Sequence, residues 1–486
     1  MDQQTASVLP LPTGEAEVSG SPQLARDHSA LSLIALGVGA TIGAGIFVLT
    51  GTAAAQYAGP GLMLSFVLGG IACTFVGLCY AELAAMIPVP GSTYAYTDAT
   101  LGRFWAWIIG WDLVLEYAMS AATVAVGWSG YVQSLMADAG LHLPPALTAS
   151  PGTALPGGET GLLNLPAAGL VLALTLLLVR GNRETNRVNL TMVVLKVAII
   201  LAFVGIGAAY VNTALWTPLV PENTGTFGEF GWSGVLRGAG VVFFAFIGFE
   251  AISTAAGETR NPQRDAPIGV LGSLAICTLL YVAVAAVLTG LVPYPALNVP
   301  DPIAKAVDTI GLGAFAIVVK VGAILGLTTA ALGALYGQAR IFYAMARDGL
   351  LPTAFARVHP RFRTPETSQG VIGVATALVA ALVPIDVLGE LVSIGTLFAF
   401  IMVCVAVLVL RRTRPGQPRP FRVPLAPLVP ILGILSCLGL MSGLPGDTWA
   451  RLALWLGLGL AIYLAYGRRR TRPAGDDVAT PSAAER

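Results

Sequence analysis

Ionisable side chains stand inside several of the longest apolar runs of the sequence. Lys196 lies within NLTMVVLKVAIILAFVG, and Glu250 lies within GVVFFAFIGFEAISTAAGE. A charge in the middle of a hydrocarbon layer costs about 2.5 kcal/mol or more, unless it faces protein or water. A lysine or glutamate in such a place can carry a proton or pair with a charged ligand, so these two positions are the first candidates for a functional site.

The second kind of candidate is backbone. The stretch GATIGAGIFVLTG places Gly43, Ala44 and Gly45 in the middle of an apolar run, and Gly248 interrupts another. Each glycine inside a helix costs up to about 1 kcal/mol relative to alanine. Close packing of helices is one interpretation, because Gly39 and Gly43 form a GxxxG pattern. The other interpretation is that both helices unwind at these glycines.

The composition places these runs in a membrane. The chain has 486 residues, of which 55% are hydrophobic and 11% charged, with a mean hydropathy of +0.76. Soluble domains carry about 25% charged residues. Runs long enough to cross about 30 Å of hydrocarbon predict about twelve helices. In chain order, segments one to twelve cover 30–56, 61–87, 103–134, 163–180, 188–210, 233–258, 266–292, 309–346, 367–384, 387–410, 424–443 and 447–467.

Arginine clusters predict the orientation. They lie between alternate segments and in the tail, as Arg180, Arg183 and Arg187; Arg260 and Arg264; Arg347, Arg357, Arg361 and Arg363; Arg411, Arg412, Arg414, Arg419 and Arg422; and Arg468, Arg469, Arg470 and Arg472. The loops near 135–162 and 211–231 contain acidic residues and no lysine or arginine. This pattern predicts an integral plasma (inner) membrane protein with both termini in the cytoplasm. The clusters also suit contact with membrane lipid headgroups.

Several kinds of site are missing from the sequence. None of the lysines follows a glycine, so there is no Walker A phosphate loop. The histidines fall outside the predicted segments, and the cysteines form no CxxC pair. We therefore expect no enzymatic activity, no metal, no cofactor and no nucleic-acid partner. These exclusions favour a secondary transporter.

The two glycine breaks occupy matching places, because segments one and six begin two halves of five segments each. Paired broken helices are the best sequence indication of a transporter's midplane site. A helix that restarts at Gly43–Gly45 presents N–H groups with partial positive charge, which suit a carboxylate. The first half of segment six ends near Phe246 with carbonyls that suit an ammonium. The sequence therefore predicts that backbone at the two breaks binds both ends of a zwitterion.

Four stretches resemble a known family. GATIGAGIF, GWDLVLEYAMSAATVAVGWSGY, FFAFIGFEAISTAAGETRNPQRDAPIGV and TTAALGALYGQARIFYAMARDGLLP are similar to the amino acid–polyamine–organocation superfamily, and within it to the cationic amino acid transporter group. The resemblance implies an all-α polytopic membrane protein with a five-plus-five inverted repeat, discontinuous helices 1 and 6, and two extra helices. It divides the chain into a disordered tail 1–28, repeats 29–210 and 211–410, added helices 411–467 and a disordered tail 468–486.

The resemblance also implies the contacts of an L-amino acid substrate. Its carboxylate is expected to bind the N–H groups of Gly43, Ala44 and Gly45. Its amine is expected to bind the carbonyls of Thr41, Phe244 and Ile247. Phe244 stands where the family places an aromatic lid, and a core phenylalanine is the alternative. Glu116 on segment three is a candidate specificity carboxylate, and a structural carboxylate is the alternative. The expected substrate is thus a cationic or small neutral L-amino acid.

The same resemblance implies that Lys196 couples transport to protons, since its ammonium replaces an ion bound in sodium-coupled relatives. Desolvation of a lysine in an apolar site favours release of its proton. Snorkelling of its ammonium to the headgroups is the alternative, and Glu250 is a rival proton carrier. Thr328 and Thr329 on segment eight match ion-ligating hydroxyls, so they either partner Lys196 or segment one, or bond to their own backbone.

Other features leave alternatives open. An amino acid exchanger and a non-transporting amino acid sensor would share the predicted site, and nothing in the sequence tests for a small accessory membrane subunit. Glu82 on segment two is expected to pack structurally. Lys320 on segment eight has no assigned role.

Overall fold

The computed structural model describes residues 29–87, 92–153, 158, 160–181, 185–255, 259–362 and 364–467. The predicted tails 1–28 and 468–486 lie outside the described residues, as do Arg183 and Arg363. The regular elements of the described chain are helices, which confirms the all-α prediction.

Most helices follow the predicted segments within a few residues, whereas α4 and α11 lie between predicted segments and were not predicted. Their bounds are α1 Ala30–Thr41, α2 Thr50–Ala53, α3 Leu62–Met86, α4 Ser92–Leu101, α5 Arg103–Asp138, α6 Leu165–Arg180, α7 Thr185–Gly207, α8 Gly231–Val242, α9 Ala251–Thr254, α10 Pro262–Leu291, α11 Pro302–Thr309, α12 Gly313–Arg347, α13 Glu366–Leu382, α14 Ile385–Thr413, α15 Leu428–Ser442 and α16 Gly446–Ala465. Among the described residues, eight helical spans are long and apolar enough to cross a membrane. The membrane class is therefore clear, while the number of crossings and the inverted repeat stay predictions.

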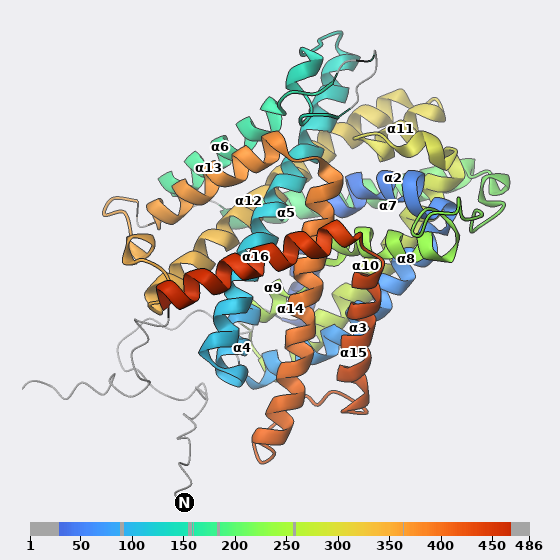
Figure 1. The fold of residues 1–486 in the computed structure, drawn as a ribbon. Helices are drawn as coiled ribbons and strands as arrows, with labels where there is room; N and C mark the ends of the chain where they lie inside the picture. The colour runs from blue at the N-terminus through green and yellow to red at the C-terminus, as the bar shows by residue number, and fades with distance from the viewer. Residues whose placement is uncertain are drawn as a thin grey trace, which may run out of the picture.

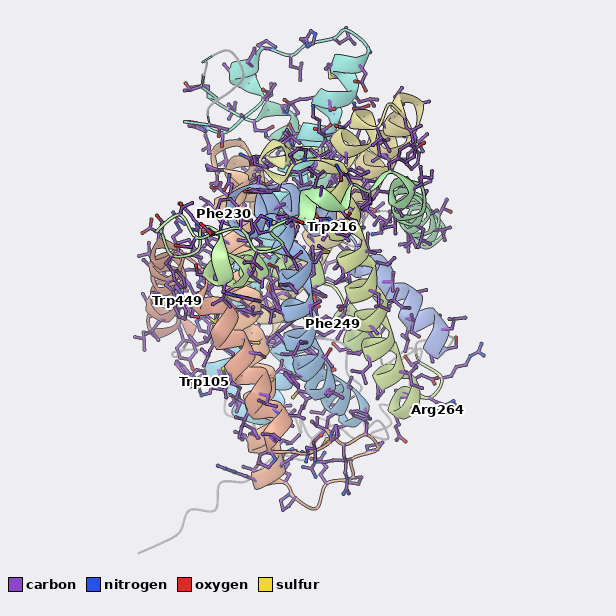
Figure 2. The ribbon with its side chains drawn as sticks, turned by 90° about the vertical axis from the view of Figure 1, so that its right-hand side faces the viewer. Trp105, Trp216, Phe230, Phe249, Arg264 and Trp449 are labelled. Atoms are coloured by element: carbon purple, nitrogen blue, oxygen red, sulfur yellow. The ribbon has the colours of Figure 1, made fainter. Side chains whose placement is uncertain are left out.

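Two long helices form the centre of the bundle. α5 has 36 residues and α12 has 35, and the two pack along each other. α14 packs on α5, α10 packs on both α1 and α3, and α6 and α13 pair at one edge (Figure 1). Arg264 lies at the beginning of α10, whereas Trp216 lies against its end, where the indole Nε1 donates to the carbonyl of Ala286 (3.3 Å; Figure 2). The arginine-bearing loop and the loop without basic residues thus lie at opposite ends of α10, and the orientation in the membrane stays a prediction.

A tryptophan pair attaches α16 to α5. The rings of Trp111 and Trp455 stack with centroids 4.6 Å apart. Each indole N–H donates to the backbone carbonyl of the other residue, at 2.9 and 3.0 Å. Both carbonyls lie within helices, so these bonds satisfy the indoles where water is absent. The pair places α16 across α5 and α14 (Figure 1).

Glu82 is the centre of an ion-pair network, which agrees with the structural role expected for it. Its carboxylate is 1% exposed and accepts from Arg411 Nε (3.0 Å) and Nη2 (2.5 Å). Arg419 Nε lies 3.4 Å from the same carboxylate, and the Val423 N–H donates to it at 2.7 Å. The network therefore ties α3 to the end of α14 and to the loop that follows it.

Lys320 has a structural partner that sequence reasoning does not identify. Its ammonium is 2.6 Å from Asp138 of α5 and 3.5 Å from Asp308 of α11, and the lysine side chain is 3% exposed. Next to this pair, the Ser134 hydroxyl donates to Asp301 (2.5 Å). Residues far apart in the sequence thus hold α5, α11 and α12 together.

The Glu82 network generates a stability prediction. We expect Glu82→Gln to lower the free energy of unfolding by about 3 kcal/mol, because it leaves a buried arginine without its counter-charge. Thermal melting in detergent measures the change. Glu366→Gln is the matched control, since Glu366 is 44% exposed and pairs with His359 only at 3.6 Å. Equal melting temperatures for the two variants would contradict the assignment.

Candidate functional site

Segment one is interrupted at the predicted glycines. α1 ends at Thr41, and Ile42 has extended backbone angles (φ −74°, ψ 103°). The chain then turns back into a helix, where the N–H groups of Ile46 and Phe47 donate to the carbonyl of Gly43, each at 3.3 Å. Gly43, Ala44 and Gly45 therefore belong to the first turn of this half-helix, whose N–H groups have no partner within the helix.

Segment six is interrupted as well. α8 ends at Val242, a 3₁₀ turn covers Phe243–Phe246, and Ile247 is extended (φ −65°, ψ 134°). Gly248 has a φ of +125°, a conformation that favours glycine. The Glu250 carboxylate accepts from the N–H of Gly248 (2.8 Å), within the break itself.

The two breaks are in direct contact. A Cβ atom on Gly45 would lie 2.3 Å from Cα of Ala245, and one on Gly248 would lie 2.6 Å from the carbonyl carbon of Ala40. No side chain fits at either glycine without moving backbone. By contrast, a Cβ on Gly43 would meet nothing nearer than 3.8 Å. The breaks thus agree with the unwinding interpretation, and the close packing lies at Gly45 and Gly248 rather than at Gly43 of the GxxxG pattern.

Some residues at the two breaks are partly exposed. Gly43, Ile247 and Gly248 are half-buried, while Ala44 and Gly45 beside them are buried. Ala330 on α12, which lies nearest to Gly43, is half-buried too. Part of the main chain at both breaks is therefore accessible in this structure.

Lys196 reaches the end of α1. Its ammonium donates to the carbonyls of Gly39 and Ile42, the latter at 2.7 Å, and the residue is 3% exposed. The lysine does not extend toward the headgroups, so the snorkelling alternative does not describe this structure. A Cβ on Gly326 would lie 3.4 Å from Cβ of Lys196, so α12 packs on the lysine stem. The ammonium thus stands where α1, α7 and α12 meet.

The hydroxyls of segment eight bond within their own helix rather than to Lys196 or to segment one. Thr328 and Thr329 donate to the carbonyls of Ile324 (2.7 Å) and Gly326 (2.9 Å) in their own helix. Of the two alternatives for these threonines, the structure therefore shows hydrogen bonds to their own backbone.

Glu116 is 4% exposed on α5, and its Oε2 has no hydrogen-bond partner among the described residues. One turn earlier, Asp112 is fully buried with both oxygens unpartnered within the same part of the chain, 3.3 Å from a Cβ placed on Gly395 of α14. Sequence reasoning missed Asp112, although the spacing WDLVLE indicates a shared helix face. The two acids thus stand together on α5, and Asp112 contacts α14.

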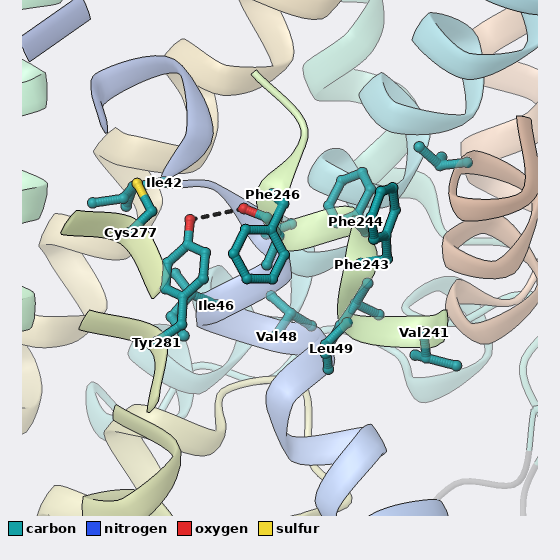
Figure 3. Close-up of a cluster of buried hydrophobic side chains, with 14 of the residues drawn as sticks. Ile42, Ile46, Val48, Leu49, Val241, Phe243, Phe244, Phe246, Cys277 and Tyr281 are labelled. Carbon is teal, nitrogen blue, oxygen red and sulfur yellow. Dashed lines mark hydrogen bonds between the residues drawn. The ribbon is translucent and has the colours of Figure 1, made fainter. Parts of the chain in front are cut away.

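The phenylalanines of segment six belong to the core. The ring of Phe246 lies 6.2 Å from Phe66 and 5.4 Å from Tyr281, between α3 and α10 (Figure 3). Phe244 is 5% exposed, which matches the core alternative for its side chain in this conformation. Any contribution of these residues to the site therefore comes from their main chain.

Two tyrosines from continuous helices contact the breaks, and no sequence motif marks them. The Tyr281 hydroxyl on α10 is 3.0 Å from the carbonyl of Thr41 and 2.8 Å from that of Ala245. The Tyr131 hydroxyl on α5 donates to the carbonyl of Phe47 (2.8 Å). The only sequence signal is a tyrosine within an apolar run, which is also typical of ordinary core packing.

An all-helical membrane bundle with two broken helices that meet at one point defines the class of polytopic membrane transporters. The chain matches the model of the amino acid permease family over residues 29–459, and it belongs to that family. This result confirms the family resemblance, and the chain is a permease rather than an enzyme.

Curated relatives cover nearly the whole chain. It is 46% identical to the methylthioribose transporter of Bacillus subtilis, over 95% of this chain and 97% of that protein. It is 47% identical to the branched-chain amino acid permease BcaP of Bacillus subtilis, over 94% and 96% of the two chains. It is 40% identical to the vacuolar cationic amino acid transporter 4 of Arabidopsis thaliana, over 82% of this chain and 66% of that protein.

The contact between the breaks predicts a difference between neighbouring glycines. We expect Gly45→Ala to lower the free energy of unfolding by about 1–3 kcal/mol, because its methyl group would overlap the backbone of Ala245. Gly43→Ala should stay within about 0.5 kcal/mol of the wild-type value. Ligand-free melting curves in detergent compare them, and a Gly45→Ala protein as stable as Gly43→Ala would show that the breaks do not touch.

Proposed function

We propose that the protein takes up L-α-amino acids with small or branched apolar side chains, driven by protons, through alternating access of a five-plus-five inverted repeat. In this proposal the chain crosses the plasma (inner) membrane twelve times, and both termini lie in the cytoplasm. The contact between two unwound backbone segments carries it. Such a pair offers N–H groups and carbonyls to a single solute in the middle of the bundle.

Each end of the substrate has its own set of main-chain groups. The carboxylate binds the N–H groups of Gly43, Ala44 and Gly45, at a helix start with about half a positive charge. The ammonium binds carbonyls at the end of α1 and in the turn of segment six, at Thr41, Phe244 and Ile247. Because these groups are backbone, they read the two ends of any α-amino acid and leave its side chain to other contacts.

The surroundings favour an apolar side chain. Ile247 and Ala330 are half-buried beside the breaks and carry no charge. Glu116 is 4% exposed, and no ammonium or guanidinium could reach it without desolvation. The BcaP relative, named for branched-chain amino acids, agrees with this choice. If the protein takes up a cationic amino acid instead, Glu116 is again the candidate for the residue that binds the side chain of the substrate.

The proton enters the cycle at Lys196. Its ammonium donates to carbonyls at the C-terminal end of α1, where the helix carries partial negative charge. When the proton leaves for water, that charge attraction ends and α1 is released from α7. Glu250 holds the N–H of Gly248 and has no comparable partner to release, so Lys196 is the better carrier.

A second candidate substrate is a neutral sugar thioether, because the relative named for methylthioribose is 46% identical. Such a solute has neither a carboxylate nor an ammonium. It would leave the charged ends of the two breaks without their complement.

The zwitterion site predicts a binding pattern in detergent. L-leucine should raise the melting temperature in proportion to RT ln(1 + [L]/Kd), whereas its methyl ester and 4-methylpentanoate, at equal concentration, should not. Methylthioribose and L-lysine complete the set of ligands. Stabilisation by 4-methylpentanoate or by methylthioribose equal to that by L-leucine would overturn the zwitterion site.

Proton coupling predicts that Lys196→Met abolishes accumulation in proteoliposomes. A single proton moving through 100 mV supplies about 2.3 kcal/mol, which supports roughly 50-fold accumulation in the wild type. The variant should lose this accumulation and keep exchange of labelled substrate. Lys320→Met is the control, because its ammonium is also buried but pairs with Asp138 away from the breaks.

Accumulation by Lys196→Met equal to that of the wild type would refute the coupling role. Wild-type uptake that needs internal substrate and ignores the proton gradient would identify an exchanger. Binding without any exchange would identify a sensor.

A further inference from the structure

We propose that His359 is a pH-sensitive switch: its neutral imidazole holds the loop between α12 and α13 closed, and protonation of the ring opens it. In the predicted orientation this loop lies in the cytoplasm. The inference goes beyond the proposed function, because it does not depend on which solute the protein carries.

The imidazole of His359 is the acceptor around which the loop turns. Its Nδ1 accepts from the backbone N–H groups of Arg361 and Phe362, each at 3.1 Å. The backbone N–H of His359 donates to the carbonyl of Thr364 at 2.8 Å. The imidazole also packs on the ring of Phe362, with centroids 4.7 Å apart. One residue therefore holds the turn through both its backbone and its ring.

Only one form of the ring can make these hydrogen bonds. A neutral imidazole donates from one nitrogen and accepts at the other, whereas a protonated imidazole donates from both. The Glu366 carboxylate of α13 lies 3.6 Å from Nε2 of His359, which favours the hydrogen on Nε2 and leaves Nδ1 as an acceptor. A proton on Nδ1 would face two N–H donors, so the closed turn excludes the protonated ring.

Histidine is the side chain that ordinarily changes its charge between about pH 5 and pH 8. Around His359, Glu366 of α13 favours the protonated ring, while Arg361 of the loop opposes it. Arg180, at the end of α6 that meets this loop, also opposes it. Because the closed turn accepts only the neutral ring, the contribution of His359 is complete above the range in which histidine titrates. It is lost as the pH falls through that range.

The loop joins the ends of three helices. Phe355 packs on Phe342 of α12 with centroids 5.6 Å apart, and its carbonyl accepts from the Ser368 hydroxyl of α13 at 2.7 Å. The Thr364 hydroxyl donates to the carbonyl of Val179 at the end of α6, at 2.8 Å. Opening of the turn therefore weakens the attachment of α6, α12 and α13 to one another at this end of the bundle.

Hydrogen–deuterium exchange of the full-length protein in detergent tests the switch. Mass spectrometry follows the peptide that contains the N–H groups of Arg361 and Phe362, and each rate is divided by the intrinsic rate at the same pH. We expect the protection to fall about tenfold between about pH 7.5 and about pH 5.5. Equal protection at the two pH values would overturn the proposal.

Two variants separate the imidazole from its neighbours. His359→Ala has no acceptor, so the peptide should be as unprotected at both pH values as the wild type is at the lower one. Glu366→Gln keeps the imidazole and removes the carboxylate, so the fall in protection should remain. Wild-type protection of His359→Ala at the higher pH, or loss of the pH dependence in Glu366→Gln, would overturn the role of the ring.

His142→Ala is the matched control, because His142 is an exposed histidine in the loop that follows α5. Its peptide 359–362 should show the same pH dependence as the wild type, and a variant that lost this dependence would overturn the assignment to His359. If His359→Ala does not fold, the wild type and Glu366→Gln decide the question. None of these measurements uses a transported solute, so a failure of the proposed function would leave their outcome unchanged.

Discussion

The main constraint on this molecule is that peptide groups in a membrane must find their hydrogen bonds within the protein. An unbroken helix meets the constraint by itself, and a broken one does not. Donors and acceptors from neighbouring elements therefore surround the two breaks: Lys196 and Tyr131 at segment one, Glu250 at segment six, and Tyr281 at both. In the proposed function, main-chain groups of Gly43 and Ile247 bind the two ends of the solute.

Close approach is the second condition. Gly45 faces Ala245 and Gly248 faces the end of α1 at distances that exclude a side chain. A zwitterion of fixed length can meet N–H groups of one break and carbonyls of the other only if the two are adjacent. In the proposed function, the distance between the two breaks therefore limits the length of the solute that the backbone binds, and the side chains around Ala330 limit its side chain.

The sequence was sufficient to place the helices and the breaks, because both follow from local patterns. Apolar runs define the spans within a few residues, and glycines in the middle of such runs mark Gly43–Gly45 and Gly248. Partners of single side chains depend on packing between distant helices, which no local pattern records. Lys320 pairs with Asp138 across 182 positions, and Tyr281 meets Thr41 across 240. In the sequence, Tyr281 differs in no way from a tyrosine that only fills space.

The Glu82 network has a consequence for biogenesis. Arg411 and Arg419 belong to one of the arginine clusters that predict the orientation, and such charges act during insertion, when the segment is still in water. In the folded protein the same guanidinium groups contact a carboxylate that is 1% exposed. In the predicted orientation, the same two residues act at two successive stages: they first keep this loop in the cytoplasm and later hold α3 against it in the folded protein. A lysine at either position would keep the positive charge that acts during insertion. It would lose the bidentate hydrogen-bond geometry of the guanidinium in the folded protein.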